Sequence, residues 1–198
     1  MSTAIAAIAF PATLLTVYAL LRSPLARRLV AAPSADRWHE HSTPLLGGVG
    51  IFCGITAGLG LAIAAGAVPL TKGIAGIYAG IAVLFLAGLI DDLRALPPLA
   101  KLGLQVGAAV LVLATGTDVQ LIHTHVVAWA LALIWLVGMT NAFNLLDNMD
   151  GLAATLAGIA FAFFAIDAVT VHPNHTMLAL ALAGALSCAG FLPFNLRL

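Results

Sequence analysis

Charged side chains are scarce in this sequence. Only 8% of the 198 residues are charged, whereas 62% are hydrophobic. A soluble domain normally carries roughly a quarter of charged residues, so the chain lacks the side chains that would cover a water-exposed surface. This shortage excludes an ordinary soluble domain and favours a protein that is embedded in a lipid bilayer.

Basic residues and cysteines are also few. Eight Lys and Arg residues balance eight Asp and Glu residues, and no basic stripe is present. Nucleic-acid binding therefore has no electrostatic support. The two cysteines, Cys53 and Cys188, lie inside apolar runs, which indicates small buried hydrophobic residues and not a disulfide or a metal site.

The apolar residues form seven runs close to the length of about 20 residues that a membrane-spanning helix needs. The runs are Ala4–Leu21, Leu45–Val68, Ile74–Ile90, Leu99–Thr115, Val126–Thr140, Gly151–Val169 and Met177–Leu192. No basic stretch precedes the first run and Pro11 interrupts it, so we expect a retained helix and not a signal peptide. The predicted fold class is all-α: a polytopic transmembrane bundle of about seven helices, in a single membrane domain over residues 1–198.

The basic residues predict the orientation of this bundle. With the N-terminus outside, seven of the eight fall on the cytoplasmic side: Arg22, Arg27, Arg28, Arg37, Arg94, Lys101 and Arg197. Only Lys72 is then outside, as the positive-inside rule prefers. Glycines four residues apart, at 50/54/58, 76/80 and 103/107, predict close packing of helices within the bundle.

Two adjacent acids end the third run, in "LFLAGLIDDLR". Asp91 and Asp92 repel one another and lie at a helix C-terminus, where the macrodipole disfavours negative charge. They could be interfacial acids paired with Arg94. A bound divalent cation would remove both penalties together, so we favour a metal-binding role.

The stretch "NAFNLLDNMDG" adds a second polar group beside an apolar run. If the fifth helix continues through it, Asn141, Asn144, Asp147 and Asp150 follow one another at i, i+3 spacing along a stripe. Their oxygen atoms suit a hard cation such as Mg²⁺. The alternative makes Asp150 the N-cap of the sixth helix, with Gly151 easing the turn, which would leave the other three unexplained.

The first inside loop, "DRWHEHSTPLLGGVG", supplies cations and a glycine pair. Arg37 and His39 could meet phosphates or face anionic lipid headgroups, and Gly47 and Gly48 permit close approach of the backbone to a ligand or helix.

Four histidines of the outside loops could suggest a metal site, but their spacing favours solvated loop residues: His123, His125, His172 and His175. Taken together, the acids, amides, glycines and cations of the predicted cytoplasmic side suit Mg²⁺ and a phosphate-bearing substrate.

Three motifs carry a family resemblance: "RWHEHSTPLLGG", "GLIDDLRALPPLAKLGLQ" and "NAFNLLDNMDGLA". In this order they resemble the polyprenyl-phosphate N-acetylhexosamine-1-phosphate transferases, glycosyltransferase family 4. That family includes the undecaprenyl-phosphate GlcNAc-1-phosphate transferases and the muramoyl-pentapeptide transferase. The closing "GFLPFN" is also similar, whereas the family usually has glycine in place of Asn148.

The resemblance implies a reaction and a role for each motif. A polyprenyl phosphate attacks a UDP-sugar at the cytoplasmic membrane face, UMP leaves, and a polyprenyl-diphosphate sugar remains for cell-wall or polysaccharide biosynthesis. Catalytic or metal-binding roles fall on Asp91, Asp92, Asp147 and Asp150, with Mg²⁺ or alternatively Mn²⁺. Substrate-binding roles fall on Asn141, Asn144, Lys101, Gln105, Arg37, His39, Gly47 and Gly48. Lys101 is placed to meet the lipid phosphate, and a homodimer is left open.

The chain ends before two further motifs of the family: a glycine-flanked aspartate motif, G-D-x-G-S, and a histidine-rich loop. The family also has more helices. We therefore interpret the sequence as the N-terminal portion of the family fold. On that basis we expect the 198-residue chain to release little or no UMP from UDP-GlcNAc with undecaprenyl phosphate and Mg²⁺.

Two other classes compete with the enzyme. A transporter or channel with an acidic cytoplasmic vestibule would also place acids in membrane helices, but the predicted acids lie at helix ends on one side and not at the midplane. A non-catalytic membrane scaffold descended from the enzyme is the third class.

Overall fold

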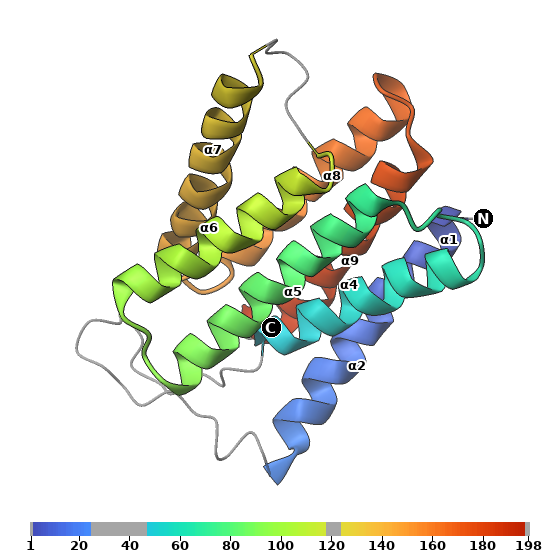
Figure 1. Ribbon diagram of the computed structural model, residues 1–198. Coiled ribbons are helices and arrows are strands. Elements are labelled where there is room, and N and C mark those ends of the chain that lie inside the picture. Colours follow the sequence, from blue (N-terminus) through green and yellow to red (C-terminus); the bar gives the residue numbers. More distant parts are fainter. Residues whose placement is uncertain (1, 25–46, 118–123, 197–198) are drawn as a thin grey trace. The chain divides into compact units, whose positions relative to one another are not determined.

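The computed structural model describes residues 2–24, 47–117 and 124–196, and within these ranges the protein is built of α-helices (Figure 1). The helices are α1 (Ser2–Ala6), α2 (Ala9–Arg22), α4 (Gly47–Ala64), α5 (Lys72–Leu93), α6 (Pro98–Ala114), α7 (His125–Leu146), α8 (Leu152–Thr170) and α9 (His175–Asn195). Among the described residues, six spans are long and apolar enough to cross a bilayer, with α1 and α2 contributing one of them, and α6 is a shorter apolar helix. The predicted all-α membrane bundle of about seven helices is confirmed.

The ends of the helices follow local capping chemistry. Helix α5 begins before the predicted Ile74, because Thr71 Oγ1 accepts a hydrogen bond from the Ile74 backbone N–H at 3.3 Å. Helix α6 begins at Pro98, whose missing N–H costs nothing in the first turn. Helix α7 continues past the predicted end at Thr140 to Leu146.

Pro11 divides the first predicted run into two helices. Helix α1 ends at Ala6 and α2 begins at Ala9. Proline has no N–H to donate to the carbonyl four residues earlier, and its ring crowds that carbonyl, which here belongs to Ala7. The break therefore lies one turn before the proline.

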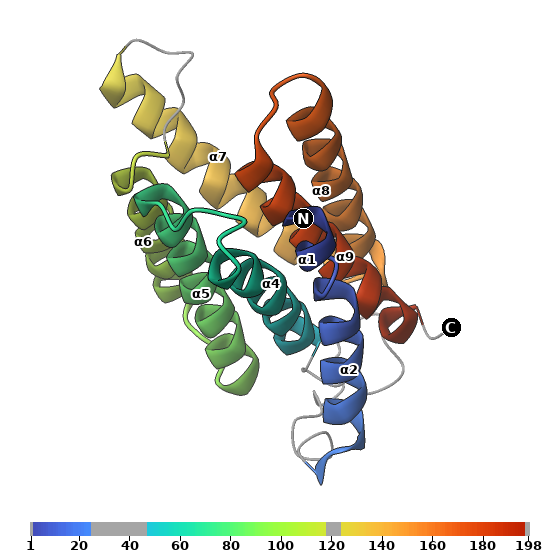
Figure 2. The same ribbon diagram turned by 90° about the vertical axis from the view of Figure 1, so that its right-hand side faces the viewer.

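The described chain forms two compact units. Unit 1 comprises Met1–Pro69 and Leu146–Leu198, and unit 2 comprises Leu70–Leu145. In unit 1, α8 and α9 form a helical hairpin, and α9 also packs against α2 and α4 (Figure 2). In unit 2, α5 and α6 pack side by side.

Glycines permit the close helix contacts in both units. A Cβ on Gly54 of α4 would overlap Thr13 Oγ1 of α2 and would lie 2.6 Å from Ser187 Oγ of α9. In unit 2, a Cβ on Gly76 would overlap Thr115, and one on Gly80 would lie 2.6 Å from Val112 Cγ2. The packing predicted for these two glycine series is confirmed. The pair at 103/107 differs, since a Cβ at either position meets no described atom within 4 Å.

Candidate functional site

The paired acids lie in the last turn of α5, where the sequence predicted them. Asp91 uses both carboxylate oxygens: Lys101 Nζ lies 2.6 Å from Oδ2, and the Leu96 backbone N–H donates to Oδ1 at 2.9 Å. These contacts fold the α5–α6 loop back on the end of α5. Lys101 is thus an ionic partner of Asp91, whereas the alternative interpretation considered Arg94.

The pairing of Asp91 with Lys101 offsets two unfavourable helix ends. The acid lies at the negative C-terminal end of α5, and the lysine lies in the first turn of α6, at its positive end. Pro97 and Pro98 start α6 directly after the short loop, so Lys101 comes back beside α5. Each side chain therefore supplies the counter-charge that the other helix end lacks.

One turn further along α6, Gln105 forms a reciprocal amide pair with Asn141 of α7. Gln105 Nε2 donates to Asn141 Oδ1 at 3.3 Å, and Asn141 Nδ2 donates to Gln105 Oε1 at 2.8 Å. Asn141 Nδ2 also donates to the Val137 carbonyl of its own helix at 2.8 Å. Gln105 is only 9% exposed, so this pair satisfies an amide that has little access to solvent.

Together these contacts join residues of three helices within unit 2. Lys101 and Gln105 lie at i, i+4 positions of α6 and share one face. Lys101 contacts Asp91 of α5, and Gln105 contacts Asn141 of α7. We call Asp91, Lys101, Gln105 and Asn141 the α6 polar cluster. Asp92 is the residue next to the cluster on α5, and Asn144 lies one turn beyond Asn141 on α7.

The remaining acids lie beyond the end of α7. The helix ends at Leu146, so the stripe that was considered for a longer helix includes Asn141 and Asn144 but not Asp147 and Asp150. Hydrogen-bonded turns replace it: Met149 N–H donates to the Leu146 carbonyl at 3.3 Å, and Leu152 N–H donates to the Met149 carbonyl at 3.2 Å.

The alternative assignment of Asp150 as an N-cap is wrong. The N-cap of α8 is Gly151, in the left-handed region with φ +72°, and its N–H donates to Asn195 Oδ1 at 2.9 Å. Asp147 and Asp150 belong to unit 1. Their convergence with Asp91 and Asp92 therefore stays a prediction.

Gly47 and Gly48, which the sequence predicts to lie in the first inside loop, begin α4 in unit 1. A Cβ on Gly47 would lie 2.5 Å from ring atoms of Phe191 on α9, whereas one on Gly48 would meet no described atom within 4 Å. Gly47 is thus required for the packing of α4 against α9, whereas the space beside Gly48 is open among the described residues. Arg37 and His39, which the sequence also predicted to bind substrate, lie outside the described residues.

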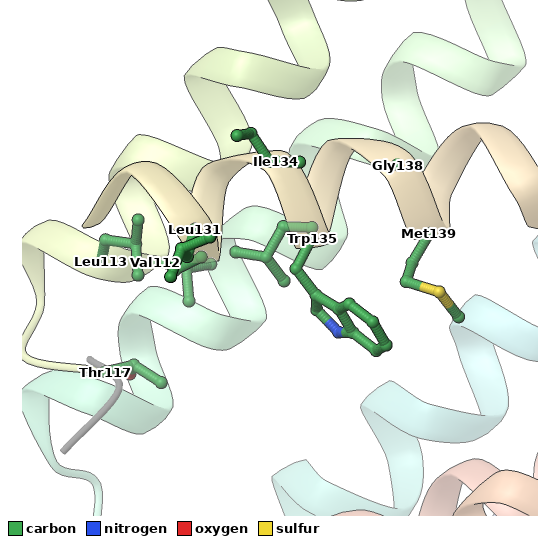
Figure 3. A pocket seen from close by; sticks show the side chains of 10 residues that line it. Val112, Leu113, Thr117, Leu131, Ile134, Trp135, Gly138 and Met139 are labelled. Carbon is green, nitrogen blue, oxygen red and sulfur yellow. The ribbon is translucent and has the colours of Figure 1, made fainter. Parts of the chain in front are cut away.

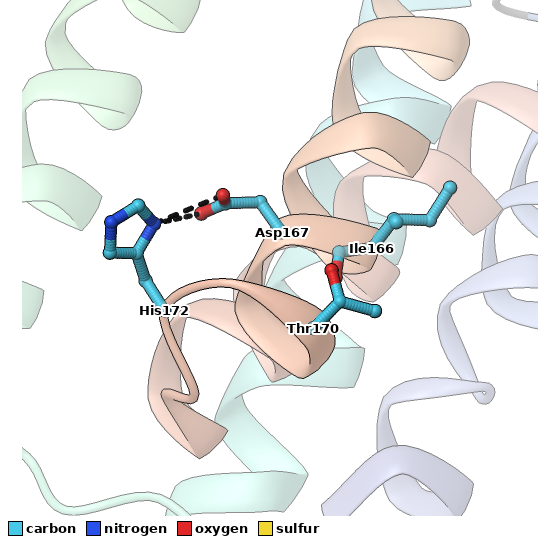
Figure 4. A network of polar contacts seen from close by, with 4 residues as sticks. All are labelled: Ile166, Asp167, Thr170 and His172. Atoms are coloured by element: carbon cyan, nitrogen blue, oxygen red, sulfur yellow. Dashed lines mark hydrogen bonds and ion pairs between the residues drawn. The ribbon is translucent and has the colours of Figure 1, made fainter.

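The histidines that the sequence predicts for the outside loops include one polar contact that sequence reasoning missed. His172 Nδ1 lies 3.0 and 3.2 Å from the two carboxylate oxygens of Asp167, across the end of α8 (Figure 4). The His172 side chain is 78% exposed, which agrees with a solvated residue. Within 2–24, 47–117 and 124–196, no group of three or more His, Cys, Asp or Glu side chains could hold a metal ion.

An apolar cavity of about 660 Å³ lies in unit 2 between the end of α6 and the middle of α7 (Figure 3). It is lined by Val112, Leu113, Thr117, Leu131, Ala132, Ile134, Trp135, Leu136, Gly138 and Met139. Met139 precedes Asn141 of the α6 polar cluster by two residues. The apolar lining therefore comes close along α7 to the polar residues.

Comparison with known proteins identifies the family. The model of the family described as glycosyl transferase family 4 matches residues 74–198. The chain belongs to glycosyl transferase family 4. The match includes the α6 polar cluster, the acids of the turn after α7 and Asn195.

Several known proteins are similar over most of this chain. A Bacillus subtilis (strain 168) protein, named a probable undecaprenyl-phosphate N-acetylglucosaminyl 1-phosphate transferase, is 32% identical over 95% of the chain and 55% of its own length. A decaprenyl-phosphate N-acetylglucosaminephosphotransferase of Mycobacterium leprae (strain TN) is 30% identical over 96% of the chain and 54% of its own length.

A phospho-N-acetylmuramoyl-pentapeptide-transferase of Oceanobacillus iheyensis is similar over a shorter stretch. It is 37% identical over 45% of the chain and 27% of its own length. The chain spans about half the length of the curated relatives that match nearly all of it.

Proposed function

We propose that this chain takes part in transferring a sugar-1-phosphate, N-acetylhexosamine-1-phosphate, from a UDP-sugar to a polyprenyl phosphate at the cytoplasmic membrane face. The observation that carries the proposal is the α6 polar cluster, which joins Asp91, Lys101, Gln105 and Asn141 at one end of unit 2. The names of the relatives supply the substrate class, a polyprenyl phosphate and an N-acetylglucosamine phosphate.

The reaction explains why cations and acids occur together. An oxygen of the lipid phosphate forms a bond to the sugar-linked phosphorus, and the bond from that phosphorus to the UMP oxygen breaks. Several phosphate charges must approach one another, so positive charge has to lower their repulsion. Lys101 is the cation of the cluster and is 37% exposed, which supports a role in meeting the lipid phosphate.

The donor atoms available here suit Mg²⁺, with Mn²⁺ as an alternative. Mg²⁺ is usually held by one or two carboxylates together with waters and substrate phosphates, so the adjacent pair Asp91 and Asp92 fits it without a closed cage of protein ligands. We assign the ligand roles to Asp91, Asp92, Asp147 and Asp150. When bound, the ion neutralises charge on the reacting phosphates.

Asn141 and Asn144 are the amides proposed to contact the nucleotide sugar. Their side chains lie one turn apart on α7, and Asn141 is oriented by Gln105 and by the Val137 carbonyl. A side chain oriented by two hydrogen bonds loses little freedom when it binds a ligand. Gln105 thus supports substrate binding through Asn141.

The apolar cavity of unit 2 is our proposed site for part of the prenyl chain. The residues that line it are apolar except for Thr117, and the lining on α7 runs to Met139, near Asn141. A polyprenyl phosphate has a charged head and a long apolar tail, so it needs both environments along one path.

A binding and turnover experiment with the purified protein tests this function. We expect Mg²⁺-dependent binding of UDP-GlcNAc and undecaprenyl phosphate, and loss of the Mg²⁺ dependence in Asp92→Asn. Release of UMP that also disappears in Asp92→Asn would establish the transfer itself. Failure to bind either substrate overturns the proposal, and ion flux through the protein in liposomes would indicate a transporter instead.

A further inference from the structure

A hydrogen bond joins two segments of unit 1 that are far apart in the sequence. The Gly151 N–H, at the start of α8, donates to Asn195 Oδ1, in the last turn of α9, at 2.9 Å. The contact therefore connects the "GFLPFN" segment with the turn that carries Asp147 and Asp150.

Gly151 has a backbone conformation that favours glycine. Its φ of +72° lies in the left-handed region that favours glycine, and as N-cap of α8 it has no side chain to bind the N–H groups of the first turn. A Cβ at this position would overlap Leu196 Cδ2, so the space beside Gly151 is already filled from the end of α9. Leu196 and Asn195 together fix how the chain enters α8.

Helix α9 is well suited to act as the anchor. It is the most buried of the six candidate spans. In an 18-residue apolar stretch of α9, 44% of the residues are buried inside the protein, against 11–33% for the other spans. Its packing against α2, α4 and α8 restrains the position of Asn195. Asp150 directly precedes Gly151, so the restraint is transmitted through a single peptide bond.

We propose that Asn195 is a positioning residue for Asp147 and Asp150. Its side-chain oxygen holds the Gly151 N–H and thereby keeps the turn between α7 and α8 in the conformation in which these acids bind the divalent cation. The inference rests on the proposed function, because it needs the two acids to be metal ligands.

Two near-isosteric substitutions test the role of the acceptor oxygen. Asn195→Leu removes the acceptor, and Asn195→Asp keeps an oxygen in the same place. With Mn²⁺ as the probe and electron paramagnetic resonance as the readout, we expect Asn195→Leu to weaken binding about tenfold, as is usual when a residue that orients a metal ligand is lost. Asn195→Asp should retain the affinity of the unsubstituted chain.

Asn174→Leu is the matched control on the same helix. Asn174 Oδ1 accepts the N–H groups of Thr176 and Met177 at 3.0 and 3.1 Å, so it caps the opposite end of α9. Its loss should lower the thermal stability of the protein without changing its affinity for Mn²⁺. Equal weakening by Asn174→Leu and Asn195→Leu would show a general loss of structure and would overturn the inference.

Hydrogen exchange separates failure of this inference from failure of the proposed function. We expect the Gly151 amide to exchange faster in Asn195→Leu than in the unsubstituted chain. If the unsubstituted chain does not bind Mn²⁺, the proposed function fails. If it binds Mn²⁺ and Asn195→Leu binds it equally well, or if Asn195→Asp behaves like Asn195→Leu, the positioning role of Asn195 is wrong.

Discussion

Asp91 and Lys101 form a charged pair that contributes little to folding stability. Both side chains remain partly exposed, at 23% and 37%, and exposed ion pairs contribute only about 0–1 kcal/mol to folding. Each side chain is disfavoured by the dipole of its own helix and favoured by that of the other helix, so the dipoles add little to this value. The pair therefore has little structural value that would by itself account for the lysine.

Lys101→Met tests this separation of binding from stability. We expect the thermal unfolding temperature to change little, since the ion pair is exposed. Affinity for undecaprenyl phosphate should fall by roughly tenfold or more, because a lost hydrogen bond to a charged group costs about 1.5–3 kcal/mol. Calorimetric unfolding and a lipid-binding titration in detergent measure the two effects.

Lys72→Met provides the control for that substitution. Lys72 begins α5, at the end of the helix opposite Asp91 and Asp92, and it is exposed. The same loss of charge at this position should leave the affinity for the lipid phosphate unchanged. Equal losses in the two variants would mean that the lipid responds to net charge and not to Lys101.

At the scale of helices, the amide pair between Gln105 and Asn141 links α6 to α7, and its two members are not equivalent. Asn141→Leu leaves the largely buried Gln105 amide without its partner, which costs about 1–3 kcal/mol. Gln105→Leu should cost less, because Asn141 keeps its bond to the Val137 carbonyl. The unfolding free energies of both variants give the comparison.

The double variant Gln105→Leu/Asn141→Leu then distinguishes a structural amide from one that also binds substrate. Replacing both members should recover most of the stability lost in Asn141→Leu, since no buried amide is left unsatisfied. We expect it nonetheless to bind UDP-GlcNAc poorly. A stable double variant with normal affinity for UDP-GlcNAc would remove Asn141 from the proposed substrate site.

The cavity beside α7 can be filled without straining the backbone. A Cβ on Gly138 meets no described atom within 4 Å, so Gly138→Leu should place its side chain in the cavity. Displacing two buried methylene groups of a prenyl chain would cost about 1.6 kcal/mol, or roughly tenfold in affinity. Binding of undecaprenyl phosphate should weaken accordingly, whereas geranyl phosphate should bind as before.

Gly60→Leu on α4 is the control for the cavity variant, since Gly60 is exposed and equally free of close neighbours among the described residues. It should not affect either lipid. If Gly138→Leu weakens geranyl and undecaprenyl phosphate alike, the cavity does not hold the distal part of the chain.

Helices were easier to predict from this sequence than the turns between them. Runs of apolar residues set the existence of α4 to α9, since each run must reach across a bilayer. The turn before α8 could not be predicted in this way, because one of its contacts is not local. Asn195 lies 44 positions from Gly151 in the sequence, and no pattern around Asp150 reveals that partner.

For the site too, the sequence predicted which residues matter but not which residues contact one another. Gln105 and Asn141 were both singled out, but their pairing depends on how α6 packs beside α7. Lys101 was expected to meet a phosphate, whereas Arg94 was the partner considered for the acids. The start of α6 at Pro98, which returns Lys101 to α5, decides that Asp91 pairs with Lys101.

At the scale of the whole molecule, the distribution of basic residues predicts which end of each helix faces the cytoplasm. The loop between α4 and α5 should be outside, and the loop between α5 and α6, which follows Asp91 and Asp92, should be inside. Leu70, in the first loop, and Leu99, in the first turn of α6 directly after the second loop, report on these two positions because they are 68% and 82% exposed. Neither residue belongs to the proposed site.

Single cysteines at these positions test the orientation in a background in which Cys53 and Cys188 are replaced by alanine. A membrane-impermeant maleimide added to intact cells should label Leu70→Cys, whereas Leu99→Cys should be labelled only after the membrane is permeabilised. A nucleotide sugar made in the cytoplasm can reach Asp91 and Asp92 only with this orientation. Labelling of Leu99→Cys from outside would place the acids on the wrong face of the membrane and would contradict both the orientation and the proposed transfer from a UDP-sugar.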